Sequence, residues 1–133
     1  MTVLSSERVP VASEVDIVNV RRRVRDVTSQ LGFSLVDQTK MVTAASELAR
    51  NALIHGGGGS MELTAMNGPR TGVRLLFQDQ GPGIPDIQLA LRDGFTTGSG
   101  LGLGLGGAKR LVNEFEIDSR PGAGTKVVIT RWK

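Results

Sequence analysis

The chain has 133 residues, enough for one domain with a buried core, and carries a small net charge of +3. It contains no cysteine and a single histidine, His55, which excludes disulfides, a cysteine nucleophile and cysteine- or histidine-rich metal sites. No apolar run is long enough to span a membrane, and the N-terminus lacks the apolar core of a signal peptide. We therefore expect a cytoplasmic protein without a membrane partner, with residues 1–133 folded as one domain.

The basic residues gather at positions 21–25, where arginines surround one valine. They interleave with apolar Val20, Val24 and Val27 at helical spacing, so we interpret them as the solvated face of a helix. Aromatic residues are also too few for a base-stacking surface. Nucleic acid is therefore not expected as a partner.

Two helices are predicted in the N-terminal half. Ser13 and Ser34 can each cap a helix, and each is followed three residues later by an acidic residue. Apolar residues then repeat at helical spacing. The first helix should end at Gly32, and the second at the glycine run of residues 56–59.

A strand pair should follow the second helix. Residues 61–65 alternate between apolar and polar, residues 67–69 (NGP) supply a turn, and residues 73–77 form the partner strand. A short helix is plausible over residues 86–91.

The C-terminal part is predicted to contain a third helix and two strands. The helix should carry Ala108, Leu111, Val112 and Phe115, and the strands should lie near residues 116–119 and 126–130. Strands joined by short turns are antiparallel. We therefore expect an α/β protein of the α+β two-layer sandwich type, with helices on one face of a mostly antiparallel mixed sheet.

Three polar residues stand four apart on the second predicted helix: Glu47, Asn51 and His55. This spacing places them roughly on one face of the helix, away from most of its apolar positions. One interpretation is an ordinary solvated stripe. The other is a carboxylate and an amide oxygen offered to a hard cation or a phosphate site, since Mg²⁺ prefers oxygen ligands.

An acidic turn follows the second strand of the pair, at residues 79–83 (DQGPG). An aspartate before glycines is typical of a turn. Apolar Ile84 follows, however, and could wall a pocket in which Asp79 accepts a hydrogen bond from an exocyclic amine. Gly83 would let a flat base lie against the backbone.

The second glycine cluster, residues 94–107, leads into the third predicted helix. Backbone amides that glycines leave accessible just before a helix N-terminus are suited to bind phosphate. The leucines that alternate with these glycines are typical of a lid that closes over a ligand. The other interpretation is a flexible loop without a ligand. Gly102, Gly104 and Gly107 form a G-x-G-x-x-G pattern, but the absence of a preceding strand argues against a dinucleotide site.

In combination, these motifs resemble those of the GHKL ATPases, the family of histidine kinases, gyrase and Hsp90. Residues 47–51 (ELARN) resemble the N box and residues 79–83 the first glycine box. Residues 100–104 (GLGLG) resemble the second glycine box and Gly124-Thr125 the last. The resemblance implies a Bergerat-type fold that binds ATP beneath a mobile lid.

A branch of this family, the RsbT-type stressosome switch kinases, is similar over further stretches. Residues 93–97 (DGFTT) and the closing residues 131–133 (RWK) carry this similarity. His55 and Gly56 depart from the branch, whose members usually have Tyr-Ala there. His55 is more typical of a helix end than of a catalyst, whereas Arg50 could stabilise phosphate charge or pair with an acid.

The resemblance implies a role for each matching position. Asn51 would coordinate Mg²⁺, and Glu47 would act as the base on a serine or threonine hydroxyl. On the base side of the ATP site, Asp79 would take the adenine amine with help from Gly81, Gly83 and Thr125. The glycines that would hold the phosphates are Gly100, Gly102 and Gly104.

The same resemblance implies partners. RsbT-type kinases phosphorylate STAS-domain scaffold or antagonist proteins, are thereby released, and then bind and activate a PP2C-type phosphatase. The alternative is an anti-sigma factor kinase, which binds an RNA polymerase sigma factor. A third possibility is a module that binds ATP without transferring phosphate.

Overall fold

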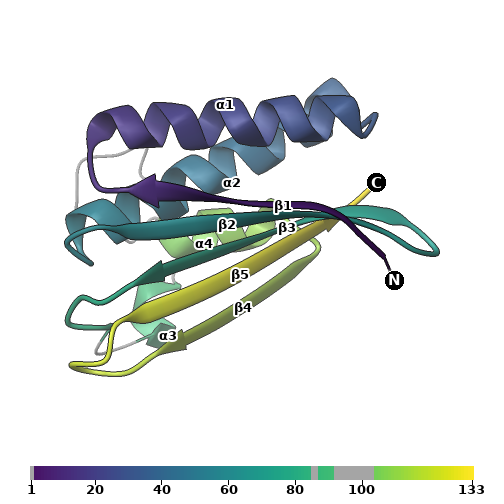
Figure 1. Cartoon of the computed structure of the whole chain (residues 1–133). Helices are drawn as coiled ribbons and strands as arrows, with labels where there is room; N and C mark the ends of the chain where they lie inside the picture. The colour runs from purple at the N-terminus through teal and green to yellow at the C-terminus, as the bar shows by residue number, and fades with distance from the viewer. Residues whose placement is uncertain (1, 85–86, 92–103) are drawn as a thin grey trace.

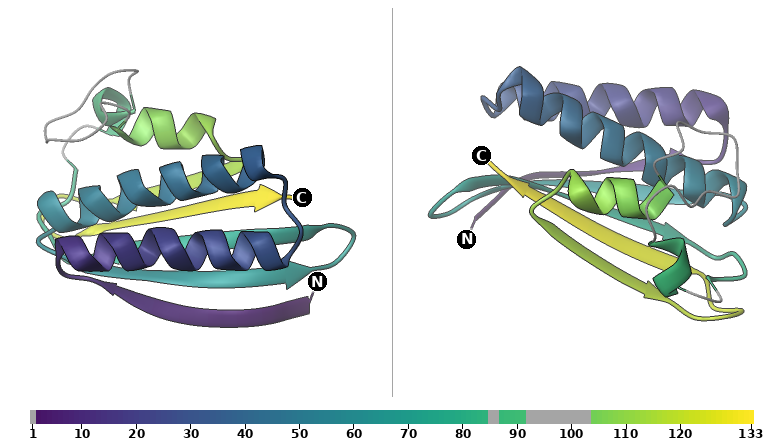
Figure 2. Two further views of the ribbon diagram at one scale, coloured as in Figure 1. Left: turned by 90° about the horizontal axis from the view of Figure 1, so that it is seen from above. Right: turned by 180° about the vertical axis from the view of Figure 1, so that it is seen from behind.

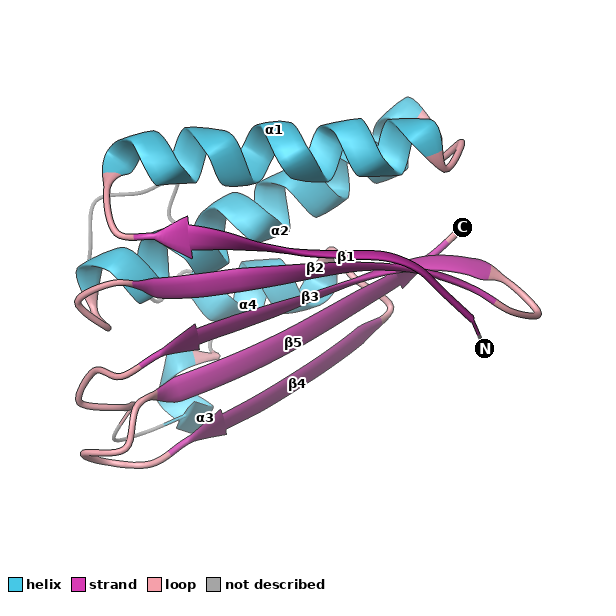
Figure 3. Cartoon of the chain, in the orientation of Figure 1, coloured by secondary structure: helices cyan, strands magenta, loops and turns pink. Residues whose placement is uncertain are grey.

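The computed structural model of the chain describes residues 2–84, 87–91 and 104–133. Its elements, in chain order, are β1 (Thr2–Val11), α1 (Glu14–Gln30), α2 (Leu35–Ile54), β2 (Gly59–Asn67), β3 (Thr71–Asp79), α3 (Ile87–Ala90), α4 (Gly104–Arg110), β4 (Glu114–Ser119) and β5 (Thr125–Trp132) (Figure 3). In this part of the chain, five strands form one sheet in the order β1-β2-β3-β5-β4, with antiparallel pairing throughout. The helices cover one face of the sheet (Figures 1 and 2), which confirms the two-layer α+β sandwich.

The two long helices begin at the predicted caps. Ser13 precedes α1 and its hydroxyl accepts a hydrogen bond from the backbone N–H of Asp16 at 3.4 Å. Ser34 does the same for α2, accepting from the N–H of Asp37 at 3.1 Å. Each cap satisfies a backbone donor that the first helical turn leaves free.

The core lies between the sheet and α1 and α2. Alternate residues of the strands face the helices, and Leu63, Leu75 and Ile129 are completely buried there. Val20 of α1 and Met41 of α2 are equally inaccessible on the opposing layer. Each such side chain contributes roughly 1.5–3 kcal/mol by its burial, so this layer holds α2 firmly against the sheet.

No strand is predicted before Ser13, and this is wrong, because β1 pairs with β2 from Thr2 to Val11. The strand lies at the edge of the sheet, and only Val9 and Val11 in it are buried. An edge strand with one half-covered face shows little apolar alternation, and its pairing partners lie 48 (Val11 to Gly59) to 65 (Thr2 to Asn67) residues further along the chain.

The third helix is shorter than predicted. It ends at Arg110, and Phe115 belongs to β4 instead. The chain joins the sheet at Asn113, whose N–H donates to the carbonyl of Thr130 at 3.0 Å. Burial then alternates along β4, so Phe115 reaches the core with strand periodicity rather than helical periodicity. The other predicted elements are confirmed, including the short α3.

Arg131 ties the end of β5 to two helices. Its Nη2 donates to Oδ1 of Asp37, in the first turn of α2, at 2.7 Å. Its Nη1 donates to the carbonyl of Leu111, just beyond α4, at 2.8 Å. The Arg131 side chain is 15% exposed, so water screens this ion pair only weakly.

Replacing Arg131 with methionine is therefore expected to lower the free energy of unfolding by about 2 kcal/mol, because Asp37 and the Leu111 carbonyl lose their shared partner. Urea denaturation measures this change. Arg23→Met is the control, since Arg23 pairs with Glu7 and Asp26 at the surface, where a pair contributes about 1 kcal/mol or less. Equal losses of unfolding free energy in the two variants would contradict the role given to the Arg131 ion pair.

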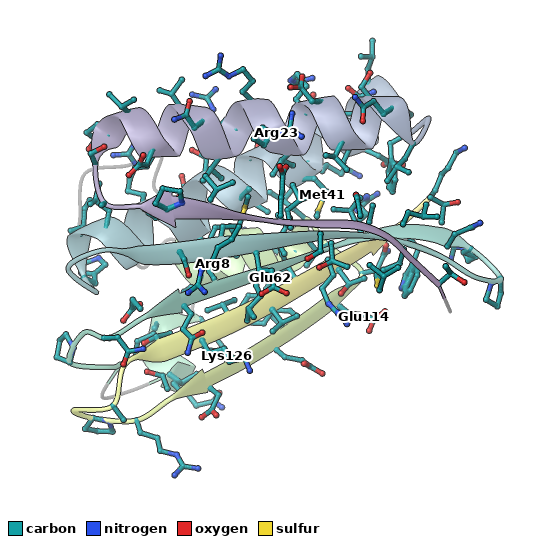
Figure 4. All side chains as sticks on the ribbon, viewed as in Figure 1. Arg8, Arg23, Met41, Glu62, Glu114 and Lys126 are labelled. Carbon is teal, nitrogen blue, oxygen red and sulfur yellow. The ribbon has the colours of Figure 1, made fainter. Side chains whose placement is uncertain are left out.

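The other face of the sheet is not covered by a described helix, and it carries charged side chains such as Arg8, Glu62, Glu114 and Lys126 (Figure 4). A hollow of about 420 Å³ lies on this face. Trp132 borders the hollow and packs its ring against Gly72. Among the described residues, no helix is both long and apolar enough to cross a membrane.

Candidate nucleotide-binding site

Three neighbouring strands bring polar side chains together at one end of the sheet. Asp79 is the last residue of β3, Thr125 the first of β5 and Ser119 the last of β4. Thr125 pairs with Asp79 on one side and with Ser119 on the other. Because side chains directly opposite each other in a sheet share a face, the three form a row across the strands. The buried residues two positions away, Phe77 and Val127, show that this is the face toward the helices.

The carboxylate of Asp79 is buried and held in a defined position. The side chain is 9% exposed, and Oδ1 accepts a hydrogen bond from the N–H of Gly81 at 2.9 Å. Asp79 therefore forms the turn that one interpretation expected. The same bond fixes the carboxylate at the strand end and leaves Oδ2 next to Gly56, where a Cβ would come within 2.6 Å of it.

The end of α2 lies directly against this carboxylate. Asn51 is half-buried, and its carbonyl accepts hydrogen bonds from the N–H groups of His55, at 2.9 Å, and Gly56, at 3.3 Å. Gly56, the residue that touches Asp79, therefore follows Asn51 by little more than one helical turn. His55 is the C-cap of α2, as its sequence position indicated.

Glu47 lies one turn before Asn51 and is 5% exposed. The prediction of a solvated stripe is therefore wrong for this residue. A glutamate is rarely buried to this extent, because removing a carboxylate from water is costly. Its burial, one helical turn before Asn51, is the feature that most favours a chemical role.

The first glycine box is packed between α2 and the turn joining β4 to β5. Gly81 lies so close to Gly56 that a Cβ on Gly81 would be 2.5 Å from the Gly56 Cα. Gly83 has φ +80°, and a Cβ there would overlap the carbonyl of Arg120. The carbonyl of Pro82 accepts from the N–H of Gly122 at 2.7 Å. This packing requires glycine at both box positions.

The second glycine box is described only in part. Gly104 begins α4 with φ +60° and is buried. Gly100 and Gly102 lie outside the described residues, as do residues 94–103 of the glycine cluster as a whole, whereas residues 104–107 belong to α4. Arg50, for which two roles were open, forms an ion pair with Glu14 at 3.6 Å.

Ser119 was not predicted as a site residue. Its hydroxyl is within 2.8 Å of the Thr125 hydroxyl and accepts from the N–H of Ile84 at 2.8 Å. No local motif marks it, and only the pairing of β4 with β5 could have placed it beside Thr125.

Comparisons with known proteins identify the family of the chain. The family described as "Histidine kinase-, DNA gyrase B-, and HSP90-like ATPase" matches residues 36–133. The serine/threonine-protein kinase RsbT of Bacillus subtilis (strain 168) is 45% identical over 126 residues, which are 93% of this chain and 94% of the relative. An anti-sigma F factor of Bacillus licheniformis is 32% identical over 110 residues, 77% of this chain and 75% of the relative.

Solved structures share the fold. The RsbU and RsbW domains of Rv1364c from Mycobacterium tuberculosis superpose with a TM-score of 0.67 at 24% identity, over 96% of this chain and 32% of that one. The mycobacterial sensor histidine kinase MprB gives a TM-score of 0.56 at 19% identity, over 96% of this chain and 97% of that one. The family match implies ATP binding, and it confirms the resemblance to the GHKL ATPases. The chain belongs to the histidine kinase-, DNA gyrase B- and HSP90-like (GHKL) ATPases and, within them, to the RsbT-type serine/threonine-protein kinases.

Proposed function

We propose that this chain is a Mg-ATP-dependent protein kinase and switch protein of bacterial stress signalling, acting as one ATP-binding unit over residues 1–133. It phosphorylates a serine or threonine of STAS-domain scaffold or antagonist proteins of the stressosome type. Once released, it binds the regulatory region of a PP2C-type phosphatase and activates it. The observation that carries the proposal is the buried Glu47, one turn from Asn51 on the helix whose end touches Asp79.

The base of the nucleotide is held at the strand ends. Asp79 accepts a hydrogen bond from the adenine amine, while Gly81 and Gly83 form the adjoining wall. Thr125, opposite Asp79 in the sheet, supports the same hydrogen bonds. Gly100, Gly102 and Gly104 hold the phosphates with their backbone N–H groups.

Glu47 and Asn51 fit the chemistry of phosphoryl transfer. An amide oxygen is a ligand that Mg²⁺ accepts together with phosphate oxygens and water, and Asn51 provides one. Bound Mg-ATP supplies the phosphoryl group and neutralises its charge. Glu47 accepts the proton of the attacking hydroxyl, and its burial on α2 keeps it oriented.

The proposal is tested by incubating the chain with γ-labelled ATP, Mg²⁺ and STAS-domain proteins of the same organism. We expect label on a serine or threonine of a STAS protein. ATP binding without any transfer would instead identify a module that only binds the nucleotide. Activation of the phosphatase is measured with its purified regulatory and catalytic regions.

An anti-sigma factor kinase is the second candidate, because anti-sigma F factors are 26–32% identical to this chain. Such a protein would bind a sigma factor and phosphorylate a STAS anti-anti-sigma factor. Pulldowns against a sigma factor and against the phosphatase regulatory region distinguish the two. Capture of the sigma factor alone would replace the first proposal.

Replacing Gly56 with valine is expected to weaken ATP binding by about tenfold or more. The new side chain would overlap the Asp79 carboxylate, and displacing a packed group costs about 1–3 kcal/mol. Isothermal titration calorimetry measures the loss. Gly57→Ala is the control, because a Cβ there meets nothing within 4 Å, although φ is +72°. The control should lower stability and leave ATP affinity unchanged, and equal weakening in both variants would refute the role of the Gly56 contact.

A further inference from the structure

The Ser119 hydroxyl joins three parts of the site. It accepts a hydrogen bond from the N–H of Ile84, the residue after the first glycine box, at 2.8 Å. It donates to the carbonyl of Gly124 at 3.2 Å. It also bonds the Thr125 hydroxyl at 2.8 Å, where either oxygen could be the donor. One side chain thus connects the glycine-box loop, the β4–β5 turn and Thr125.

The single proton of the Ser119 hydroxyl decides the direction of its hydrogen bond with Thr125. A serine hydroxyl has one proton to donate and two lone pairs with which to accept. The N–H of Ile84 can only donate to Ser119, and the carbonyl of Gly124 can only accept from it. When all three bonds are made, the Ser119 proton is used on Gly124, so Thr125 must donate to Ser119.

This direction determines what Thr125 offers to a ligand. With its proton turned toward Ser119, the Thr125 oxygen can only accept from a ligand that lies beside Asp79, its partner in the register of β3 and β5. Asp79 as a carboxylate is also an acceptor. Two acceptors side by side suit a group that carries two donors, such as an exocyclic amine, and disfavour a carbonyl in the same place.

We propose that Ser119 is a positioning residue that orients the Thr125 hydroxyl and thereby makes the site select a 6-amino purine over a 6-oxo purine. The proposal rests on the proposed binding of adenine by Asp79 and adds to it the residue that sets the polarity of the neighbouring hydroxyl. Ser119 itself does not touch the base; it acts through Thr125 and through the backbone of Ile84.

The experiment compares the affinities of the full chain for ATP and inosine triphosphate by calorimetry. Wild type should prefer ATP. In Ser119→Ala the Thr125 proton is free to donate to a 6-oxo group, so the preference for ATP should fall by about tenfold, as the loss of one oriented hydrogen bond implies. Ser119→Thr, which keeps the hydroxyl, should retain the preference. Ser60→Ala is the matched control, because Ser60 is a half-buried strand serine that accepts from Arg8 on the other face.

A change in the ratio of the two affinities separates this role from a merely structural one. An unchanged ratio in Ser119→Ala, even with both nucleotides bound more weakly, would overturn the proposal. If Ser119→Ala does not fold, Ser119→Cys provides the same comparison, because a thiol of similar size is a weak acceptor. Equal binding of both nucleotides by wild type would instead refute base recognition by Asp79, and the inference with it.

Discussion

Replacing Glu47 with glutamine is expected to lower kcat for phosphorylation of the STAS substrate by at least about 100-fold while leaving the affinity for ATP nearly unchanged. Loss of a positioned general base typically costs a factor of about 10² to 10⁴. Glutamine has the size of glutamate but cannot take up the hydroxyl proton, so the helix and its packing are preserved. Initial rates of label transfer at saturating ATP measure kcat, and calorimetry measures ATP binding.

Two features make this variant informative. Glu47 is 5% exposed, so the substitution removes a buried charge, and thermal unfolding must show that the fold is retained. Glu62→Gln is the matched control, because Glu62 is an exposed strand residue on the other face of the sheet and should leave kcat unchanged. Undiminished transfer by Glu47→Gln would remove Glu47 from the role of base.

The parts of the site that depend on local sequence could be predicted. The caps at Ser13 and Ser34 fix where α1 and α2 begin, and helical spacing then places Glu47 and Asn51 on one face. The burial of Glu47 did not follow from this spacing, because a polar stripe looks the same in sequence whether water or a ligand covers it. Burial is decided by what packs over the helix.

The parts that depend on pairing between distant segments could not be predicted. Ser119 joins the site only through its register with Thr125, and β1 is a strand only because the edge of β2 accepts it. The end of α4 was misplaced for a different reason. The apolar residues Leu111 and Phe115 fit either a helix or a turn followed by a strand, and the hydrogen bond of Asn113 to the sheet decides between them.

The glycine run at residues 56–59 shows the same limit. In sequence its glycines are alike, and such a cluster suggests either a mobile loop or a backbone that approaches a ligand closely. In the structure, Gly56 is pressed against the Asp79 carboxylate, whereas a Cβ on Gly57 would meet only open space. Glycine composition therefore indicates the region, but only tertiary packing identifies Gly56 as the residue that borders the site.

Replacing Asn51 with alanine is expected to abolish the strengthening of nucleotide binding by Mg²⁺. Mg²⁺ is held by few protein ligands and several waters, so the loss of its one amide oxygen removes most of what the protein contributes. We expect ATP affinity in the presence of Mg²⁺ to fall by about 10- to 100-fold, and affinity in EDTA to change little. Calorimetric titrations with and without Mg²⁺ measure both quantities.

The titrations with and without Mg²⁺ together distinguish a lost metal ligand from a general loss of packing. A general loss of packing would weaken binding equally in Mg²⁺ and in EDTA, whereas a lost metal ligand acts only when the metal is present. Asn19→Ala is the control, since Asn19 is a half-buried asparagine of α1 that bonds Arg22 at 2.6 Å. An Asn51→Ala protein that still binds ATP more tightly with Mg²⁺ than without would show that another group holds the metal, and Glu47, one turn earlier on the same helix, would be the first carboxylate to test.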